Sequence, residues 1–377
     1  MNGYRAWIFA LFALPAGITA AHATSFNATN LITDDPSVNF APLTDPNLVN
    51  AWGIAGTGTS PFWVGDNGTG LSTLYAVDPI TGAVTKNVRE VTIPGDGSVT
   101  GVTTGAAGSF NGDTFLFVSE DGTVSGWRNT LGTNNAEVLA LGSSANVYKG
   151  TAFATVGGNG YLYSANFSTG AIDVLKGSAA APNLAGNFTD PGLPAGFAPF
   201  NVKVLNGHIF VTYAMQSSPF TGDEQAGAGL GFVDEFDLQG NFIGRVASQG
   251  TLNAPWGLAI APTAFGEFAG DLLVGNFGDG TINAFDLATM AFEGQLLGPG
   301  GSPLVIDGLW SLVVGSGAGS EGSNQRIYFT AGPQDESHGL FGVISAVPEP
   351  SSIAMFGFML VFFGFMRRQT QLPRRAN

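Results

Sequence analysis

Oxygen-bearing side chains recur in this sequence where short runs of strand-forming residues end. Six of them follow such runs: Asp66, Asn67, Glu120, Asp121, Asn166 and Asn276. Carboxylate and amide oxygens suit Ca²⁺ better than a transition metal, so a calcium site would use Asp66, Asn166 and Asn276. Asp and Asn are also common turn formers, and this purely structural role competes with the functional one.

Aromatic residues and one histidine extend this candidate site. Trp52, Trp256 and Trp310 each stand at the beginning of a strand-forming run. Aromatic faces beside a few polar groups are typical of a ligand pocket, although packing inside the protein is the alternative role of these tryptophans. His338 follows Asp335-Glu336-Ser337 and is the better ligand-binding candidate of the two histidines beyond residue 23.

No residue set points to a specific reaction. The chain has no cysteine, which excludes disulfides, thiolate catalysis and zinc–sulfur sites. His208 and His338 lie far apart in the sequence, which disfavours a His-rich metal site or a haem, and no Gly-x-Ser-x-Gly turn is present. We therefore assign no catalytic residue and leave open whether the protein is an enzyme. Calcium is the one candidate cofactor.

Charge limits the partners. The eight basic and 27 acidic residues between Thr24 and Val347 give this span a formal charge near −19. Such a surface repels nucleic acid, and it suits solvation or the binding of cations. With 44% apolar residues, the chain has the composition of a folded protein rather than a disordered one.

The elements that must position these residues repeat along the chain. Six units start 49 to 56 residues apart, at Trp52, Gly101, Gly150, Phe200, Trp256 and Trp310. Each unit reads as four strands separated by turns such as Asn67-Gly68 and Asp121-Gly122, and no long 3.6-residue apolar period predicts a helix. Repeats of this length predict an all-β fold, a six-bladed β-propeller with one unit per blade.

Closing the ring requires a strand from the other end of the chain. The sixth unit supplies three strands, whereas Ala28–Thr33 precedes the first unit and belongs to none. We expect this N-terminal strand to complete the last blade, because such closure removes an exposed sheet edge. The loops before the first strand and after the second strand of each blade open on one face. The candidate residues should therefore gather around the channel there, and the insertion Ala214–Gly231 should project on the same face.

The units resemble NHL-type blades, as in the strand Pro255-Trp256-Gly257-Leu258-Ala259. The chain also resembles an uncharacterised propeller family associated with PEP-CTERM tails. The matching stretches are Asp45–Gly53, Gly275–Gly280 and Gly332–Gly339. This resemblance implies a propeller fold and a location in the cell envelope, and it assigns no activity.

The N-terminus predicts a cleavable signal peptide over residues 1–23. Arg5 supplies a positive charge, and Ala6–Ile18 supplies an apolar run. Ala21-His22-Ala23 fits an A-x-A cleavage site, so the mature chain would begin near Thr24.

The C-terminus carries a second signal. Pro348-Glu349-Pro350 is followed by the uncharged run Ile353–Met366 and by Arg367-Arg368. This order resembles the PEP-CTERM sorting domain, which implies recognition by a membrane exosortase and cleavage near the Pro-Glu-Pro. As a helix the run would be ~21 Å long, and the arginine pair resembles a stop-transfer flank, so we expect transient anchoring in the inner membrane.

Three regions and two functions follow. Residues 1–23 are the expected signal peptide, 24–346 the propeller, and 347–377 the sorting and transmembrane tail. The first function is an exported envelope, outer-surface or extracellular-matrix protein that acts as a binding module for an extracellular polysaccharide or an envelope protein. The alternative is a calcium-dependent, lactonase- or esterase-like hydrolase that uses the Asp, Asn and Glu residues of one face.

Overall fold

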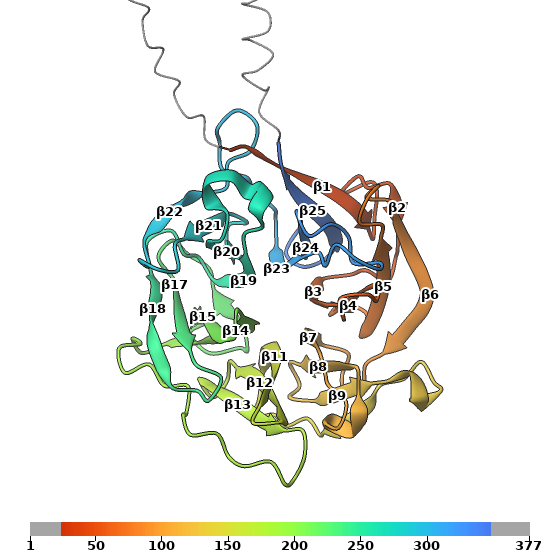
Figure 1. The fold of residues 1–377 in the computed structure, drawn as a ribbon, viewed down its shortest axis with the longest axis vertical. Helices are drawn as coiled ribbons and strands as arrows, with labels where there is room; N and C mark the ends of the chain where they lie inside the picture. Colours follow the sequence, from red (N-terminus) through yellow and green to blue (C-terminus); the bar gives the residue numbers. More distant parts are fainter. Residues whose placement is uncertain (1–23, 348–377) are drawn as a thin grey trace, which may run out of the picture.

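The computed structural model describes residues 24–347, which form six small sheets arranged in a ring around a central axis (Figure 1). Helix in this span is confined to three short 3₁₀ segments, η1 (Phe110–Gly112), η2 (Asn129–Leu131) and η3 (Thr263–Phe268). The predicted six-bladed β-propeller with few helices is therefore confirmed.

The strands of the first five blades pair antiparallel from the axis outward, and the last blade differs only in a parallel pair at its outer edge. Blade one contains β3 (Ala51–Ala55), β4 (Phe62–Asp66), β5 (Leu71–Val77) and β6 (Val84–Thr92), and blade two contains β7 (Val99–Thr104), β8 (Phe115–Ser119), β9 (Val124–Trp127) and β10 (Glu137–Ala140). Blade three contains β11 (Tyr148–Val156), β12 (Asn159–Asn166) and β13 (Ala171–Lys176).

Blade four contains β14 (Phe197–Leu205), β15 (His208–Gln216), β17 (Gly231–Phe236) and β18 (Phe242–Ser248), and the short β16 (Glu224–Gln225) pairs with β15. Blade five contains β19 (Pro255–Ile260), β20 (Leu272–Asn276), β21 (Ile282–Phe285) and β22 (Phe292–Gln295). Blade six contains β23 (Leu309–Val314), β24 (Ile327–Ala331) and β25 (Leu340–Ala346), followed outward by β1 (Phe26–Thr33) and β2 (Leu43–Thr44).

The N-terminal strand closes the last blade as predicted. β1 pairs antiparallel with β25 from Phe26 opposite Ala346 to Thr33 opposite Leu340. Phe26 and Ile32 are fully buried, so the strand contributes apolar contacts as well as backbone hydrogen bonds. The first and last strands of the domain therefore lie side by side and join the two ends of the ring.

Blade three differs from the predicted four strands, since within residues 24–347 it has three. The segment after β13 contains Pro182, Pro191 and Pro194, which cannot donate ladder hydrogen bonds. This segment instead crosses to blade four, where the Phe188 backbone N donates to Gly240 O at 3.0 Å. The Phe188 ring packs between Tyr163 of blade three and Phe236 of blade four.

Small residues allow the innermost strands to approach one another. Gly53, Gly101, Gly150 and Gly257 occupy one repeated position, the third residue of β3, β7, β11 and β19. A Cβ atom on Gly53 would lie 2.5 Å from Thr100 O, and one on Gly101 would lie 2.8 Å from Thr151 N. The backbone of the next blade thus occupies the place of a side chain, and the residue before each glycine stands at the inner edge of its blade.

Candidate functional site

One residue from each innermost strand occupies an equivalent position beside the axis. We call this set the inner ring: Trp52, Thr100, Lys149, Phe200, Trp256 and Trp310. Strand pairing shifts register at this position in every blade, for example between Ala51 and Ile54 in blade one. Such a β-bulge re-aims a side chain, and here five of the six side chains meet across the axis. Thr100 instead donates to Tyr148 O of blade three at 2.8 Å.

The tryptophans of the inner ring form one buried aromatic stack. The Trp52 and Trp310 rings lie 3.6 Å apart at 22°, and Phe277 covers the Trp310 ring at 3.9 Å and 17°. Trp256 meets Trp52 and Trp310 edge-on. Trp310 Nε1 donates to Asn50 Oδ1 at 3.1 Å, whereas Nε1 of Trp52 and of Trp256 is buried with no acceptor among the described residues. Two indole donors thus remain unpaired inside the stack.

Lys149 is the one cation of the inner ring. Its side chain is 2% exposed, and its Nζ lies 5.1 Å from the centre of the Trp52 ring and 5.9 Å from that of Phe167. Nζ donates to Glu120 Oε1 at 2.5 Å. Burial by itself lowers the pKa of Lys149, but the nearby Glu120 and Glu224 carboxylates raise it above its ordinary value, so the side chain is charged.

A polar and aromatic rim surrounds this cation on one face of the ring. We call these residues the mouth: Asn50, Asn67, Glu120, Phe167, Phe220, Asp223, Glu224, Phe277 and Glu336. Asn67 Nδ2 donates to Glu120 Oε2 at 3.2 Å, and Asn50 Nδ2 donates to Glu336 Oε2 at 2.6 Å. Asp223 Oδ1 lies 3.9 Å from Lys149 Nζ, so the insertion 214–231 reaches this face as expected.

Two carboxyl groups of the mouth, Glu224 and Glu336, have a raised pKa. Burial raises the pKa of Glu224 to about 7, against the opposing effect of the Lys149 charge. Burial also raises the pKa of Glu336, while the hydrogen bond from Asn50 lowers it. The mouth therefore combines a buried ammonium group with two carboxyl groups whose pKa is raised by burial.

Of the residues predicted from the sequence, the structure brings together Trp52, Asn67, Glu120, Trp256 and Trp310. Glu120 and Trp52 both contact Lys149, and Asn67 bonds to Glu120. Their role in binding a ligand stays a prediction.

Asp66, Asn166 and Asn276 each make their side-chain hydrogen bonds within their own blade. Asp66 Oδ2 accepts from Thr73 N at 3.0 Å, Asn166 Oδ1 accepts from Val147 N at 3.2 Å, and Asn276 Oδ1 accepts from Asn253 N at 3.1 Å. Each is the last residue of its strand, and consecutive side chains of a strand face opposite ways. The following residues, Asn67, Phe167 and Phe277, are the ones that reach the mouth.

Asp121 and His338 organise loops. Asp121 Oδ1 accepts from Thr123 N at 2.8 Å, and His338 Nδ1 lies 2.8 Å from Asp34 Oδ2, just beyond β1. Between Thr24 and Val347 no group of three or more His, Cys, Asp or Glu side chains is spaced to hold a metal ion. The structure does not bring the side chains of Asp66, Asn166 and Asn276 together. A calcium site formed by them stays a prediction.

Sequence reasoning missed Lys149 and all three phenylalanines of the mouth, Phe167, Phe220 and Phe277. Tyr148-Lys149-Gly150 occupies the same place in its unit as Ala51-Trp52-Gly53, and this alignment was the available signal for Lys149. Phe167 and Phe277 likewise stand one residue after Asn166 and Asn276. Glu336 carried no such signal, because its approach to Asn50 depends on closure of the ring.

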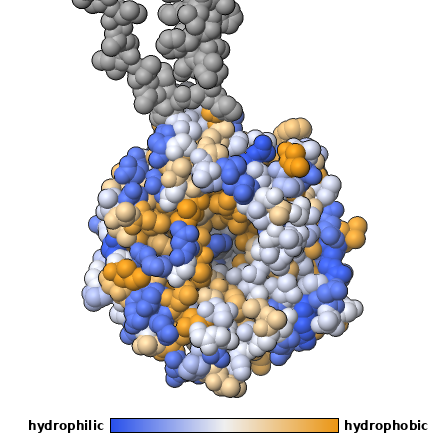
Figure 2. All heavy atoms as spheres, viewed as in Figure 1, coloured by the Kyte–Doolittle hydropathy of each residue, from blue (hydrophilic) through white to orange (hydrophobic). Residues whose placement is uncertain are grey.

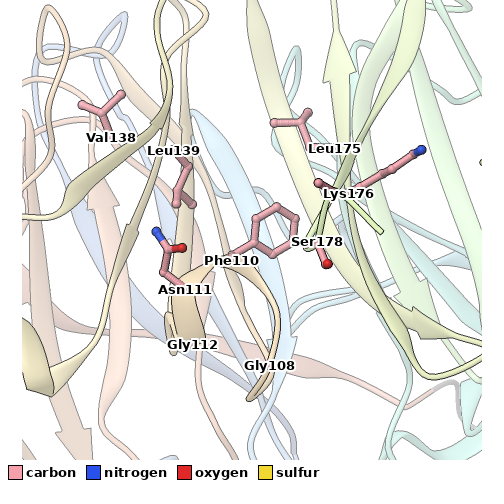
Figure 3. A pocket seen from close by; sticks show the side chains of 11 residues that line it. Gly108, Phe110, Asn111, Gly112, Val138, Leu139, Leu175, Lys176 and Ser178 are labelled. Carbon is pink, nitrogen blue, oxygen red and sulfur yellow. The ribbon is translucent and has the colours of Figure 1, made fainter. Parts of the chain in front are cut away.

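A second cavity lies away from the mouth, on the outer part of blades two and three. It has a volume of about 660 Å³ and lies between β10 and β13, with Phe110 at its base and Lys176 at its edge (Figure 3). Figure 2 shows a separate hollow at the centre of one face of the ring, with hydrophilic residues at its bottom and hydrophobic residues along part of its margin.

Residues 346–369 match the PEP-CTERM protein-sorting motif. The match begins at the end of β25, and the apolar run Ile353–Met366 lies outside the described residues. Within residues 24–347, no helix is long and apolar enough to cross a membrane. The motif indicates an exported protein that is sorted to the cell envelope.

Solved structures support the fold. An alpha-L-arabinofuranosidase from Fusarium graminearum superposes with a TM-score of 0.53 at 10% identity, over 85% of this chain and 98% of that chain. At this identity the likeness shows a shared propeller fold alone.

Two curated proteins of Acanthamoeba polyphaga mimivirus are similar in sequence along most of the chain. Uncharacterized protein R648 is 32% identical over 324 residues, which cover 81% of this chain and 77% of the viral protein. Uncharacterized protein L690 is 30% identical over 315 residues, covering 79% and 80%. Because this similarity spans about four-fifths of the chain, the protein belongs to the same family as these viral proteins.

Proposed function

We propose that the protein is exported after removal of residues 1–23 and that its propeller works as a binding module in the envelope or the extracellular matrix. The PEP-CTERM match at residues 346–369 supports this location outside the cytoplasm. An exosortase is the proposed partner of the tail, and the apolar run Ile353–Met366 is the proposed transient anchor in the inner membrane. Residues 24–346 then form the working domain.

We propose that the ligand of the mouth is a neutral or amino-sugar polysaccharide. Sugar rings pack their C–H faces on aromatic side chains, and their hydroxyl groups donate to carboxylate and amide oxygens. Phe220, with 42% exposure, and Asp223, with a side chain 69% exposed, offer both contacts at the rim. The body charge near −19 disfavours acidic polysaccharides. The observation that carries the proposal is this pairing of accessible aromatic and oxygen groups, since Phe220 packs against Phe167 and Asp223 lies 3.9 Å from Lys149.

Binding can be tested with an array of neutral, amino-sugar and acidic polysaccharides. We expect retention on neutral or amino-sugar members, and at least a tenfold loss of affinity in Phe220→Ala and in Asp223→Asn. Phe292→Ala and Glu293→Gln are matched controls, because both residues are exposed on the outer strand β22 of blade five. No retention on any member, or equal retention by all four variants, would contradict the proposal.

A hydrolase is the second candidate, and one observation favours it. Glu224, with a pKa of about 7, is protonated in part of the molecules at neutral pH, as a general acid would be. Its charge and that of Glu120 both act on Lys149, so a second carboxylate belongs to the same charged cluster. The calcium-dependent form of this proposal is tested by elemental analysis and calcium titration calorimetry. Stoichiometric binding that is lost in an Asp66→Ala/Asn276→Ala double variant would support it. Absence of metal and of heat would contradict the calcium-dependent form, and Glu224 would then be tested as a metal-independent acid against lactone, ester and glycoside substrates.

A further inference from the structure

Thr24 makes a two-point contact with one carboxylate at the start of the closing strand. Its backbone N donates to Glu267 Oε1 at 2.8 Å, and its Oγ1 donates to Glu267 Oε2 at 2.5 Å. The two residues are 243 positions apart in the sequence. Glu267 belongs to η3 of blade five, so the contact joins the residue two positions before β1 to the blade next to the closure.

The surroundings leave room for Thr24. A cavity of about 520 Å³ at this place is lined by Thr24, Gly266, Arg326 and Val347, among others. Gly266 has φ of +61°, and a Cβ there would overlap Thr24 Oγ1, so a side chain at position 266 would displace Thr24. Although partial burial raises the pKa of Glu267, the hydrogen bonds from Thr24 lower it below its ordinary value, so the group is a carboxylate at neutral pH.

The contact coincides with the cleavage site read from the sequence. Ala21-His22-Ala23 directly precedes Thr24, and hydrolysis of the Ala23–Thr24 bond would add one water, leaving a carboxylate on Ala23 and an ammonium group on Thr24. The Thr24 nitrogen would change from a neutral amide with one N–H into a cation with three. A hydrogen bond between two charged groups is stronger than one between a neutral donor and a carboxylate.

We propose that Glu267 is the binding site for the mature α-ammonium group of Thr24, so that processing strengthens the closure of the propeller. This inference rests on the signal peptide of the proposed function. The charged groups that face Thr24 are Glu267 from η3 and Arg326 from the segment before β24; the adjoining end of β25, Ser345 to Val347, has no ionisable side chain. The carboxylate is the group that bonds to Thr24, and it stabilises the ammonium form.

The test uses the chain from Thr24 to Asn377 in detergent, produced with Thr24 as its first residue. Competitive acetylation of the Thr24 amine across pH measures the pKa of that amine. We expect it above the usual range of about 7.7–8.0, back in that range in Glu267→Gln, and unchanged in the matched Glu293→Gln. Raising the salt concentration from about 0.05 to 1 M should shrink the elevation in the unmutated chain, because the pair is exposed and therefore screened.

Two outcomes overturn the inference in different ways. An amine pKa that is equal in the unmutated chain and in Glu267→Gln rules out the binding site, whatever the route of export. Mass analysis of the exported protein addresses the processing separately. A first residue other than Thr24 rules out the cleavage position and therefore the physiological role, while the acetylation result still stands on its own.

Discussion

At the scale of the residue, Lys149 shapes the mouth. It holds a position that three other blades give to tryptophan, and its ammonium group lies over an aromatic face, an arrangement that stabilises a cation. A buried charge requires a partner, and Glu120 supplies one at 2.5 Å. Glu224 and Glu336 face the same cation, but burial outweighs its effect and raises the pKa of both carboxyl groups. Lys149 therefore lies among carboxyl groups that its charge does not fully stabilise in the ionised form.

Glu224 gives a pH-dependent prediction at this scale. Its pKa of about 7 in the folded protein exceeds its value of about 4.3 when unfolded, so its stabilising contribution is complete below the unfolded value and is lost as the pH rises through 7. We expect the advantage of the unmutated protein over Glu224→Gln in free energy of unfolding to shrink between pH 4.5 and pH 8. Urea unfolding across this range measures it.

The exposed Glu293 on β22 provides the control. Glu293→Gln removes one carboxylate outside the mouth and should leave the slope of stability against pH close to that of the unmutated protein. A slope unchanged in Glu224→Gln would show that burial does not raise the pKa of this carboxyl in the folded protein.

At the scale of the element, the innermost strand of each blade does two things at adjacent residues. The bulge aims one residue at the axis, and the next position is small where the neighbouring backbone passes close by. In blade four this next residue is Asn201 instead of glycine. Its side chain contacts the neighbouring blade directly, since Nδ2 donates to Trp256 O at 2.7 Å. Contacts between neighbouring blades are therefore set by single residues of the inner strands.

Gly101→Ala tests this contact. The added Cβ would lie 2.8 Å from Thr151 N in blade three, closer than atoms can approach without a backbone shift. We expect a loss of about 1–3 kcal/mol in the free energy of unfolding, as for an overpacked core. Gly244→Ala is the control, because a Cβ at Gly244 of β18 meets no atom within 4 Å. Equal effects of the two substitutions would refute a special role for Gly101.

At the scale of the whole molecule, both ends of the domain lie together on the rim. Val347 N donates to Ser25 O at 2.8 Å, next to the pairing of Phe26 with Ala346. In Figure 1 the start of β1 and the end of β25 meet at one point of the ring, away from the central axis. Thr24 and Val347, the described residues next to the two expected processing sites, thus lie on the rim, and the mouth at the axis is separate from them.

Deletion of residues 24–35 tests closure as a property of the entire ring. The deletion removes the strand that covers β25 and buries Phe26 and Ile32, so we expect a lower melting temperature for the domain as one cooperative unit. Ile32→Ala should cost about 2–5 kcal/mol, while Thr29→Ala, at an exposed position of the same strand, should cost little. An unchanged melting temperature after the deletion would show that the ring does not need this strand.

The sequence by itself determined the repeat, the number of blades and the closing strand. These features are local patterns, which can be recognised without knowing the tertiary structure. They include units spaced by about 50 residues, turns such as Asn67-Gly68 and an unassigned strand at Ala28–Thr33. The missing fourth strand of blade three was not read, because Phe188 packs against blade four and that contact is tertiary.

The tertiary structure alone decided which oxygen-bearing residues share a site. Consecutive side chains along a strand face opposite ways, so neighbouring residues can have different surroundings. Asn166 makes its hydrogen bonds within its blade, whereas the ring of the next residue, Phe167, lies beneath the Lys149 ammonium group. Glu336 and Asn50 are 286 residues apart and meet because the last blade closes against the first. The chain specifies each blade locally, whereas the mouth forms from one or two residues of several blades, and it exists only once the ring is closed.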